Sequence, residues 1–269
     1  MADRVTPGPA AAGSAQTVNN IKESVCVHTR KVYDSCKDKD CIEDLVVFLD
    51  ASSQCYIANA IGVRARSAEL LFVGIDVEEV AFNRGYYTID CRYFYKVKGE
   101  AYSLSNKCNE ICGLAVFDKR VILFGSEGNA KIFSSSSAPS CDSMQTLMKS
   151  NMPVAVVEAV DPIILSMKLV DSCDCNLGDS ECFDIPPFIS TSFSDNLVIS
   201  GEPRRVYCTL GQFSIVKLER DSQLLIPVYD YCVPEKECVG SNDTDPCDLF
   251  KRIKFPVDEF FPPNTIHCD

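Results

Sequence analysis

Alternation of apolar and polar residues is the main pattern of this chain, and it predicts β-strands with one buried face. The clearest case is residues 86–97, where every second position is aromatic or aliphatic. The apolar face consists of Tyr87, Ile89, Cys91, Tyr93, Tyr95 and Val97. The opposite face mixes charged and aromatic side chains, so we expect this strand to cover a core with one side.

Two longer segments predict β-hairpins, because a charged corner interrupts each apolar pattern. In the first, the apolar runs 114–117 and 121–124 flank three charged residues at 118–120. In the second, residues 212–229 contain two apolar runs joined across the polar residues 219–222. Short polar corners between β-branched and aromatic runs are typical of hairpin turns.

The other patterns predict further strands, a charged bend between Cys36 and Cys41, and a short helix capped by Asp142. The expected strands begin at residue 24 and continue at 45–49, 58–80, 154–170, 188–199 and 206–210. The order of elements predicts an all-β fold, mainly antiparallel, with two pseudo-repeated β-sandwich-like units and one or two short helices. The expected divisions are a flexible arm 1–23, a first β unit 24–150, a second β unit 151–232, and a Cys/Pro-rich tail 233–269 packed on the body.

Composition narrows the function classes. The formal net charge is −12, which argues against nucleic acid as the main partner, because a phosphate backbone would be repelled. The chain has only 2 histidines, the commonest general base and metal ligand, so acid–base and metal chemistry are disfavoured. No run approaches the roughly 18 apolar residues that a membrane span requires. We predict no enzyme, no catalytic residue, no cofactor and no membrane span.

The 16 cysteines are the exceptional feature of the composition. Such a density favours disulfide bonds, within and between subunits, although the first residues do not resemble a secretory signal. We therefore expect a protein that is made in the cytosol but built for oxidation. Metal clusters, a hyperthermophile protein that is oxidised inside the cell, or assembly in a cell that later lyses would each reconcile these two features. The cross-link candidates are Cys26, Cys36, Cys41, Cys55, Cys108, Cys112, Cys141, Cys173, Cys175, Cys182, Cys232, Cys238, Cys247 and Cys268. Cys91 and Cys208 lie within expected strands and are predicted to be ordinary core residues.

Two alternatives use the same thiols differently. A structural zinc site would centre on the loop from Cys173 to Cys182, although the chain has no CxxC motif. A cysteine nucleophile would need a nearby histidine, and the candidates are His28 beside Cys26 and the C-terminal pair of His267 and Cys268. The first pair has no evident carboxylate to orient the histidine, and the second pair lies at the extreme C-terminus.

Three weaker motifs have ordinary structural interpretations. Residues 125–131 loosely resemble a phosphate loop, but their spacing departs from GxxxxGK[ST], so we expect a tight turn. Asn242 heads a glycosylation sequon that we expect to be an exposed turn. The acidic clusters at 38–44 and 243–248 do not follow a calcium-loop pattern, so solvated faces are expected.

Several long phrases together resemble the cysteine-rich proteins of clostridial spore outer layers, including an exosporium protein that forms a two-dimensional lattice. They are CVHTRKVYDSCKDKDCIEDLVVFL, FNRGYYTIDCRYFYKV, FDKRVILFGSEGNAKIFSS, VEAVDPIILSMKLVD, LERDSQLLIPVYDYCVPEKEC and DPCDLFKRIKFPVDEFFPP. The resemblance covers nearly everything from Cys26 to Asp269. It implies a non-enzymatic shell or appendage protein of the spore surface (exosporium or coat), made in the mother cell and cross-linked through cysteines. Its implied partners are copies of itself, as a homo-oligomer, lattice or filament, and other spore-coat proteins.

Overall fold

The computed structural model describes residues 26–103, 108–128, 130–132, 149–171, 185–199, 203–225, 234–235, 250 and 254–260. The strands are β1 (Cys26–Leu49), β2 (Gly62–Glu79), β3 (Tyr86–Tyr102), β4 (Cys108–Phe124), β5 (Lys131–Ile132), β6 (Lys149–Ser150), β7 (Val154–Ala159), β8 (Ile163–Asp171) and β9 (Arg204–Leu225). The helices are α1 (Ala51–Ile57), α2 (Pro187–Ser190) and α4 (Val257–Phe260). The predicted arm 1–23 lies outside the described residues.

One antiparallel sheet contains the long strands, so the all-β prediction is confirmed. It has 7 strands in the order β2-β3-β4-β1-β9-β7, and β8 also pairs with β9. β1, from the predicted first unit, pairs with β9, from the predicted second unit, between Cys26↔Leu225 and Val47↔Val206. The strands of both predicted units are therefore joined in one sheet.

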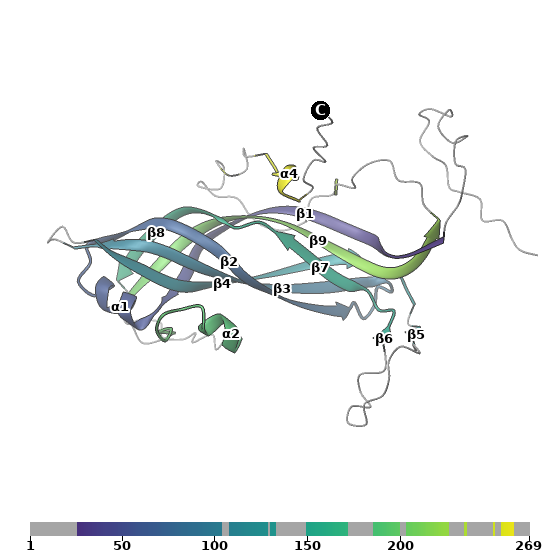
Figure 1. Cartoon of the computed structure of the whole chain (residues 1–269), viewed down its shortest axis with the longest axis horizontal. Helices are drawn as coiled ribbons and strands as arrows, with labels where there is room; N and C mark the ends of the chain where they lie inside the picture. Colours follow the sequence, from purple (N-terminus) through teal and green to yellow (C-terminus); the bar gives the residue numbers. More distant parts are fainter. Residues whose placement is uncertain are drawn as a thin grey trace, which may run out of the picture.

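The sheet curls until it is nearly closed into a barrel (Figure 1). Its first strand, β2, lies against β7 and β8 without strand pairing, and the Leu70 amide donates to Asp161 Oδ1 at 3.0 Å. Met167 of β8 packs over Gly99 of β3, where a β-carbon would lie only 2.7 Å from the methionine sulfur. Glycine at this position therefore permits the close approach that closes the barrel.

Both predicted hairpins are wrong, because each charged corner lies inside a continuous strand. Residues 118–120 belong to β4, and residues 219–222 belong to β9. The predicted bend between Cys36 and Cys41 is likewise part of β1. The physical reason is that neighbouring strands supply partners for the charges, so the chain has no need to bring them to a solvent-exposed turn.

The predicted strand at 86–97 is confirmed as part of β3, and its apolar face lines the inside of the barrel. Tyr93 and Tyr95 are fully buried and their rings stack with centroids 6.1 Å apart. Cys91 and Cys208 are buried free thiols, as predicted. In the turn before this strand, Gly85 adopts φ 79°, which favours glycine.

Short helices lie on the outside of the sheet. Asp50 caps α1, accepting a hydrogen bond from the Ser53 amide at 2.8 Å. Residues 188–199, predicted as a strand, form α2 and turns instead, and Ile189 packs over Phe94 on the outer face of β3. The helix predicted at 142–150 falls mostly outside the described residues, and its last two residues form β6.

Part of the tail also contacts the sheet. Phe250 is fully buried, and its ring centroid lies 4.6 Å from that of Phe213 in β9. Phe255 meets the same Phe213 ring edge-on. Among the helices that the structure describes, none is long and apolar enough to cross a membrane.

Candidate functional site

The predicted cross-link cysteines divide into three groups. Cys26, Cys55 and Cys108 are exposed free thiols, and Cys112 is a half-buried one. Cys36 and Cys41 are each disulfide-bonded, though not to one another, because five residues of extended strand separate them by more than a disulfide can span. The others lie outside the described residues: Cys141, Cys173, Cys175, Cys182, Cys232, Cys238, Cys247 and Cys268.

Burial makes the interior thiols poor nucleophiles. It raises the pKa of Cys91 to about 11 and that of Cys208 to about 12, so neither thiol ionises near neutral pH. Burial also raises the pKa of Cys112. Among the described cysteines, exchange chemistry is therefore left to the exposed thiols.

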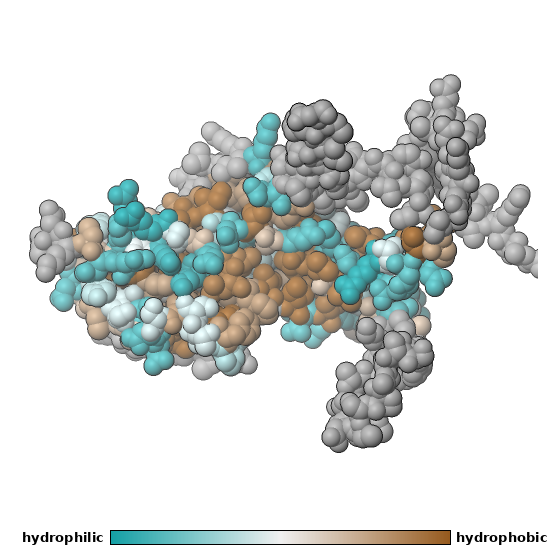
Figure 2. Space-filling view, in the orientation of Figure 1, coloured by the Kyte–Doolittle hydropathy of each residue, from teal (hydrophilic) through white to brown (hydrophobic). Residues whose placement is uncertain are grey.

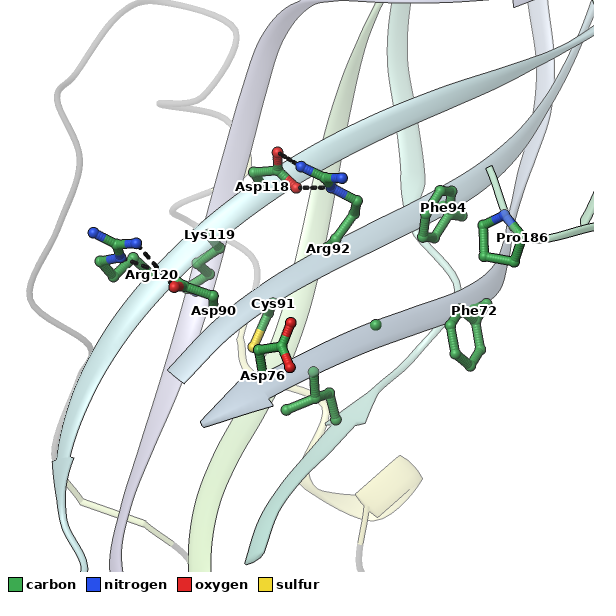
Figure 3. Close-up of a pocket in the computed structure, with 12 residues that line it drawn as sticks. Phe72, Asp76, Asp90, Cys91, Arg92, Phe94, Asp118, Lys119, Arg120 and Pro186 are labelled. Carbon is green, nitrogen blue, oxygen red and sulfur yellow. Dashed lines mark hydrogen bonds and ion pairs between the residues drawn. The ribbon is translucent and has the colours of Figure 1, made fainter. Parts of the chain in front are cut away.

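The outer face of β3 and β4 carries two bidentate ion pairs (Figure 3). Arg92 donates to Asp118 at 2.6 and 2.8 Å, and Arg120 donates to Asp90 at the same two distances. Both pairs join residues on neighbouring strands and remain partly exposed. They account for two of the three charged residues that were predicted to form a hairpin corner.

A shallow cavity of about 690 Å³ lies along this face, between the ion pairs and an apolar end formed by Phe72, Phe94 and Pro186 (Figure 3). Its guanidinium groups are already bound to carboxylates, so it offers neutralised charge beside aromatic rings. Figure 2 shows apolar residues gathered in the middle of the molecule, over the region where β2, β3 and β7 are drawn.

Lys119 points to the opposite face of β4 and forms an ion cluster inside the barrel. Its Nζ lies 2.5 Å from Asp38 and 2.6 Å from Asp40, both in β1. Asp40 is 5% exposed, and desolvation raises its pKa to about 6 although Lys119 opposes the shift. The cluster joins β1 to β4 beyond the three residues at which these strands pair, 47–49.

Polar groups without a described partner lie near this cluster. Within the described residues, Tyr95 Oη and Gln212 Oε1 are buried and have no hydrogen-bond partner. The register places Ser214 opposite Asp38 and Gln212 opposite Asp40. The middle of the barrel is therefore a polar layer between apolar ones.

After β4 the chain bends at Glu127, with Gly128 at φ 133°, and the backbone of this segment faces the wrong way for a phosphate. Gly125, Ser126 and Gly128 direct carbonyl oxygens at the buried Arg220 guanidinium, which donates to them at 2.6, 2.7 and 2.6 Å. Arg220 also donates to the Asn151 carbonyl at 2.8 Å. A phosphate site would need amide groups converging on the ligand instead.

The acidic cluster at 38–44 was expected to be a solvated face, and that expectation is wrong for its first half. Asp40 is buried and bound to Lys119, whereas the exposed Asp44 forms an ion pair with Lys168. Lysine side chains neutralise both of these carboxylates. No group of three or more potential metal ligands occurs among the described residues.

The loop from Cys173 to Cys182, the predicted zinc alternative, lies outside the described residues. So do both members of the His267 and Cys268 pair. His28 and Cys26 are both exposed at the start of β1. The structure therefore leaves these alternatives as predictions.

Sequence reasoning missed Lys119, Asp40 and Arg220 as buried polar residues. The alternation of side chains along a strand would have indicated burial of Lys119, because it alternates with apolar residues at 117, 121 and 123. Arg220 follows the same pattern after apolar residues at 216 and 218.

Fold and site together define an all-β protein with paired charges on both sheet faces and free thiols on its surface. No family model matches the chain, and no solved structure matches it. The chain is similar to Exosporium protein A of Clostridium sporogenes (strain ATCC 15579), with 31% identity over 111 residues. The match covers 40% of this chain and only 33% of the relative.

Proposed function

We propose that the chain is a non-enzymatic structural protein of a spore surface layer, which assembles with copies of itself and is stabilised by disulfide bonds. The similarity to Exosporium protein A carries the spore-surface part of the proposal. Because the match spans a third of that protein, the assembly part rests on the chain's own features.

The distribution of thiols supports assembly through disulfides. Cys26, Cys55 and Cys108 are free and exposed, so a neighbouring molecule can reach them. A bond between subunits adds covalent permanence to weak contacts. In this proposal the chain is made in the mother-cell cytoplasm and oxidised after release, with other coat proteins as further partners.

The strand architecture supports a load-bearing role. β1 and β9 pair along nearly their whole length, which gives the molecule a long, stiff axis. Strands at the edge of the sheet offer backbone groups that a second chain can pair with.

Electron microscopy of the purified full chain, with and without a thiol reductant, tests the proposal. We expect ordered polymers under oxidising conditions and their loss or weakening on reduction. A protein that stays monomeric under both conditions, as measured by light scattering, would contradict self-assembly. Polymers that persist unchanged in reductant would support self-assembly but contradict stabilisation by disulfide bonds.

A further inference from the structure

The exposed free thiols lie at opposite ends of the long axis (Figure 1). Cys26 is the first residue of β1 and pairs with Leu225 at the end of β9. We call this tip the ribbon end. Cys55 in α1 and Cys108 at the start of β4 lie at the other end, where α1 packs against β4. We call that tip the α1 end.

The separation of the two ends is large. β1 has 24 residues, and at about 3.3 Å per residue it spans roughly 75 Å. A disulfide bond requires the two α-carbons to be within about 7 Å, so Cys26 cannot bond to the α1 end of its own molecule. Any bond between the ends must join two copies.

Each end also exposes large apolar side chains beside its thiol. Leu225, opposite Cys26, is 62% exposed. At the α1 end Ile61, Tyr56 and Tyr102 are 57%, 45% and 43% exposed, and the Ile61 amide donates to the Tyr102 carbonyl at 2.8 Å. Burial of such groups against a neighbour would be favourable, and it would hold the thiols close together.

The outer edges of the ribbon end carry no further strand among the residues that the structure describes. Within the described residues, the first part of β1 (26–33) and the last part of β9 (220–225) pair only with each other. An isolated two-stranded ribbon is marginally stable in water, so contact with another molecule would stabilise it.

Charge disfavours a contact between two ribbon ends. Beside Cys26, the β1 strand carries exposed Arg30 and Lys31, of which Arg30 also has Asp221 at 3.8 Å. Beside Cys108, Glu110 is exposed. Two ribbon ends would bring Arg30 and Lys31 of both copies together, which like-charge repulsion disfavours, whereas the α1 end carries both signs, with exposed Arg64 and Arg66 as well as Glu110.

We propose that the ribbon end of one copy binds the α1 end of the next copy, and that Cys26 forms a disulfide with Cys55 or Cys108 of that neighbour. This rests on the proposed function and specifies its contact. A contact between unlike ends leaves both outer ends unused, so it repeats into an open filament or row.

The oxidant is a low-molecular-weight disulfide such as oxidised glutathione. As the Sγ–Sγ bond forms, the two protein thiols give up two electrons and two protons. The glutathione disulfide bond breaks and accepts them, which yields two reduced glutathione molecules.

Mass spectrometry of linked peptides tests the contact in full-length protein. Isotopically labelled and unlabelled copies are mixed, oxidised with oxidised glutathione, digested without reduction and searched for peptides that join a labelled to an unlabelled chain. We expect Cys26 linked to Cys55 or Cys108, and loss of that link in Cys26→Ser and in the double variant Cys55→Ser/Cys108→Ser. Cys91→Ala, which removes a buried thiol, is the matched control and should retain the link.

Complementation sharpens the result. Chains with Cys26→Ser and chains with Cys55→Ser/Cys108→Ser should each lack the link alone and form linked dimers when mixed. Links between two Cys26 residues, or an unchanged linkage pattern in both variants, would overturn the end-to-end contact while leaving self-assembly intact. Wild-type protein that does not associate under any condition would overturn both proposals.

Discussion

Lys119 and Arg120 are neighbours in β4, yet they occupy opposite environments. The Lys119 side chain is 8% exposed and holds two carboxylates inside the barrel. The Arg120 side chain is 70% exposed and pairs with Asp90 on the outer face. The difference follows from the period of two along a strand, which sends adjacent side chains to opposite faces. The same rule separates buried Arg220 from exposed Asp221 in β9.

The two environments predict different energetics for similar ion pairs. On the outer face, water screens the charges, so a pair contributes little to stability. Inside the barrel, removal of one partner leaves the other charge buried, unpaired and poorly hydrated, which costs several kcal/mol of folding free energy. Mutations that remove inner and outer charges should therefore differ in effect by several-fold.

The largest effect is expected for Arg220→Met. The arginine donates to four carbonyl oxygens and to the Tyr87 hydroxyl. Its loss leaves several buried acceptors unsatisfied, and we expect the free energy of unfolding to fall by more than about 4 kcal/mol. Urea denaturation followed by circular dichroism measures it. Asp221→Asn, on the exposed neighbour, is the control and should cost less than about 0.5 kcal/mol; equal losses in the two variants would contradict the comparison.

Lys119→Met should have the next largest effect. The variant keeps much of the side-chain volume but leaves Asp38 and Asp40 without their cation, so we expect a loss of about 3 kcal/mol at neutral pH. Chemical denaturation of Lys119→Met and of its neighbour Arg120→Met gives the comparison. A loss for Arg120→Met as large as that for Lys119→Met would show that the face of the strand does not decide the energy.

The strand pattern was sufficient to predict the fold class and some elements. Residues 86–97 show unbroken alternation, and the structure has them as part of β3. The hairpins failed because charged residues at 118–120 resemble a turn when only one strand is considered. Their partners Asp90, Arg92 and Asp38 lie far away in sequence, so these ion pairs cannot be predicted from the segment 118–120 alone.

The site was less predictable than the fold, for a related reason. A thiol in a strand, such as Cys91, can be assigned to the core from its flanking residues. The exposed position of Cys55 depends on α1, a short helix whose existence rests on the Asp50 cap and on packing against β4. That the exposed thiols gather at two ends follows from the pairing of the long strands, which spacing alone does not give.

The pH dependence of stability should separate the inner carboxylate from the outer one. Burial raises the pKa of Asp40 to about 6 in the folded state, against about 3.9 in an unfolded chain. Between these values the folded state binds more protons, so Asp40 should make stability fall as pH rises from about 4 to about 6, by up to about 3 kcal/mol. Urea denaturation of wild type and Asp40→Asn at several pH values measures the difference.

Asp90 is the matched carboxylate on the outer face, and its contribution to stability should change with pH in the opposite direction. The hydrogen bond from Arg120 lowers its pKa, so its contribution is present above its unfolded pKa and is lost as pH falls through the folded one. Asp90→Asn should therefore weaken the protein more at neutral pH than in acid. The same pH slope in Asp40→Asn as in wild type would contradict a raised pKa at Asp40.

The smallest effect is expected for the outer pair of Arg92 and Asp118. In a double-mutant cycle with Arg92→Ala and Asp118→Ala, the coupling should be below about 1 kcal/mol, because both side chains are partly exposed. It should fall further in about 1 M salt, where the screening length is only about 3 Å. A coupling energy that is large and insensitive to salt would mean that the outer face is shielded from water, for example by another copy seated in the adjoining cavity. Repeating the cycle below and above the concentration at which the protein assembles would distinguish these cases, since only a shielding partner makes the coupling depend on concentration.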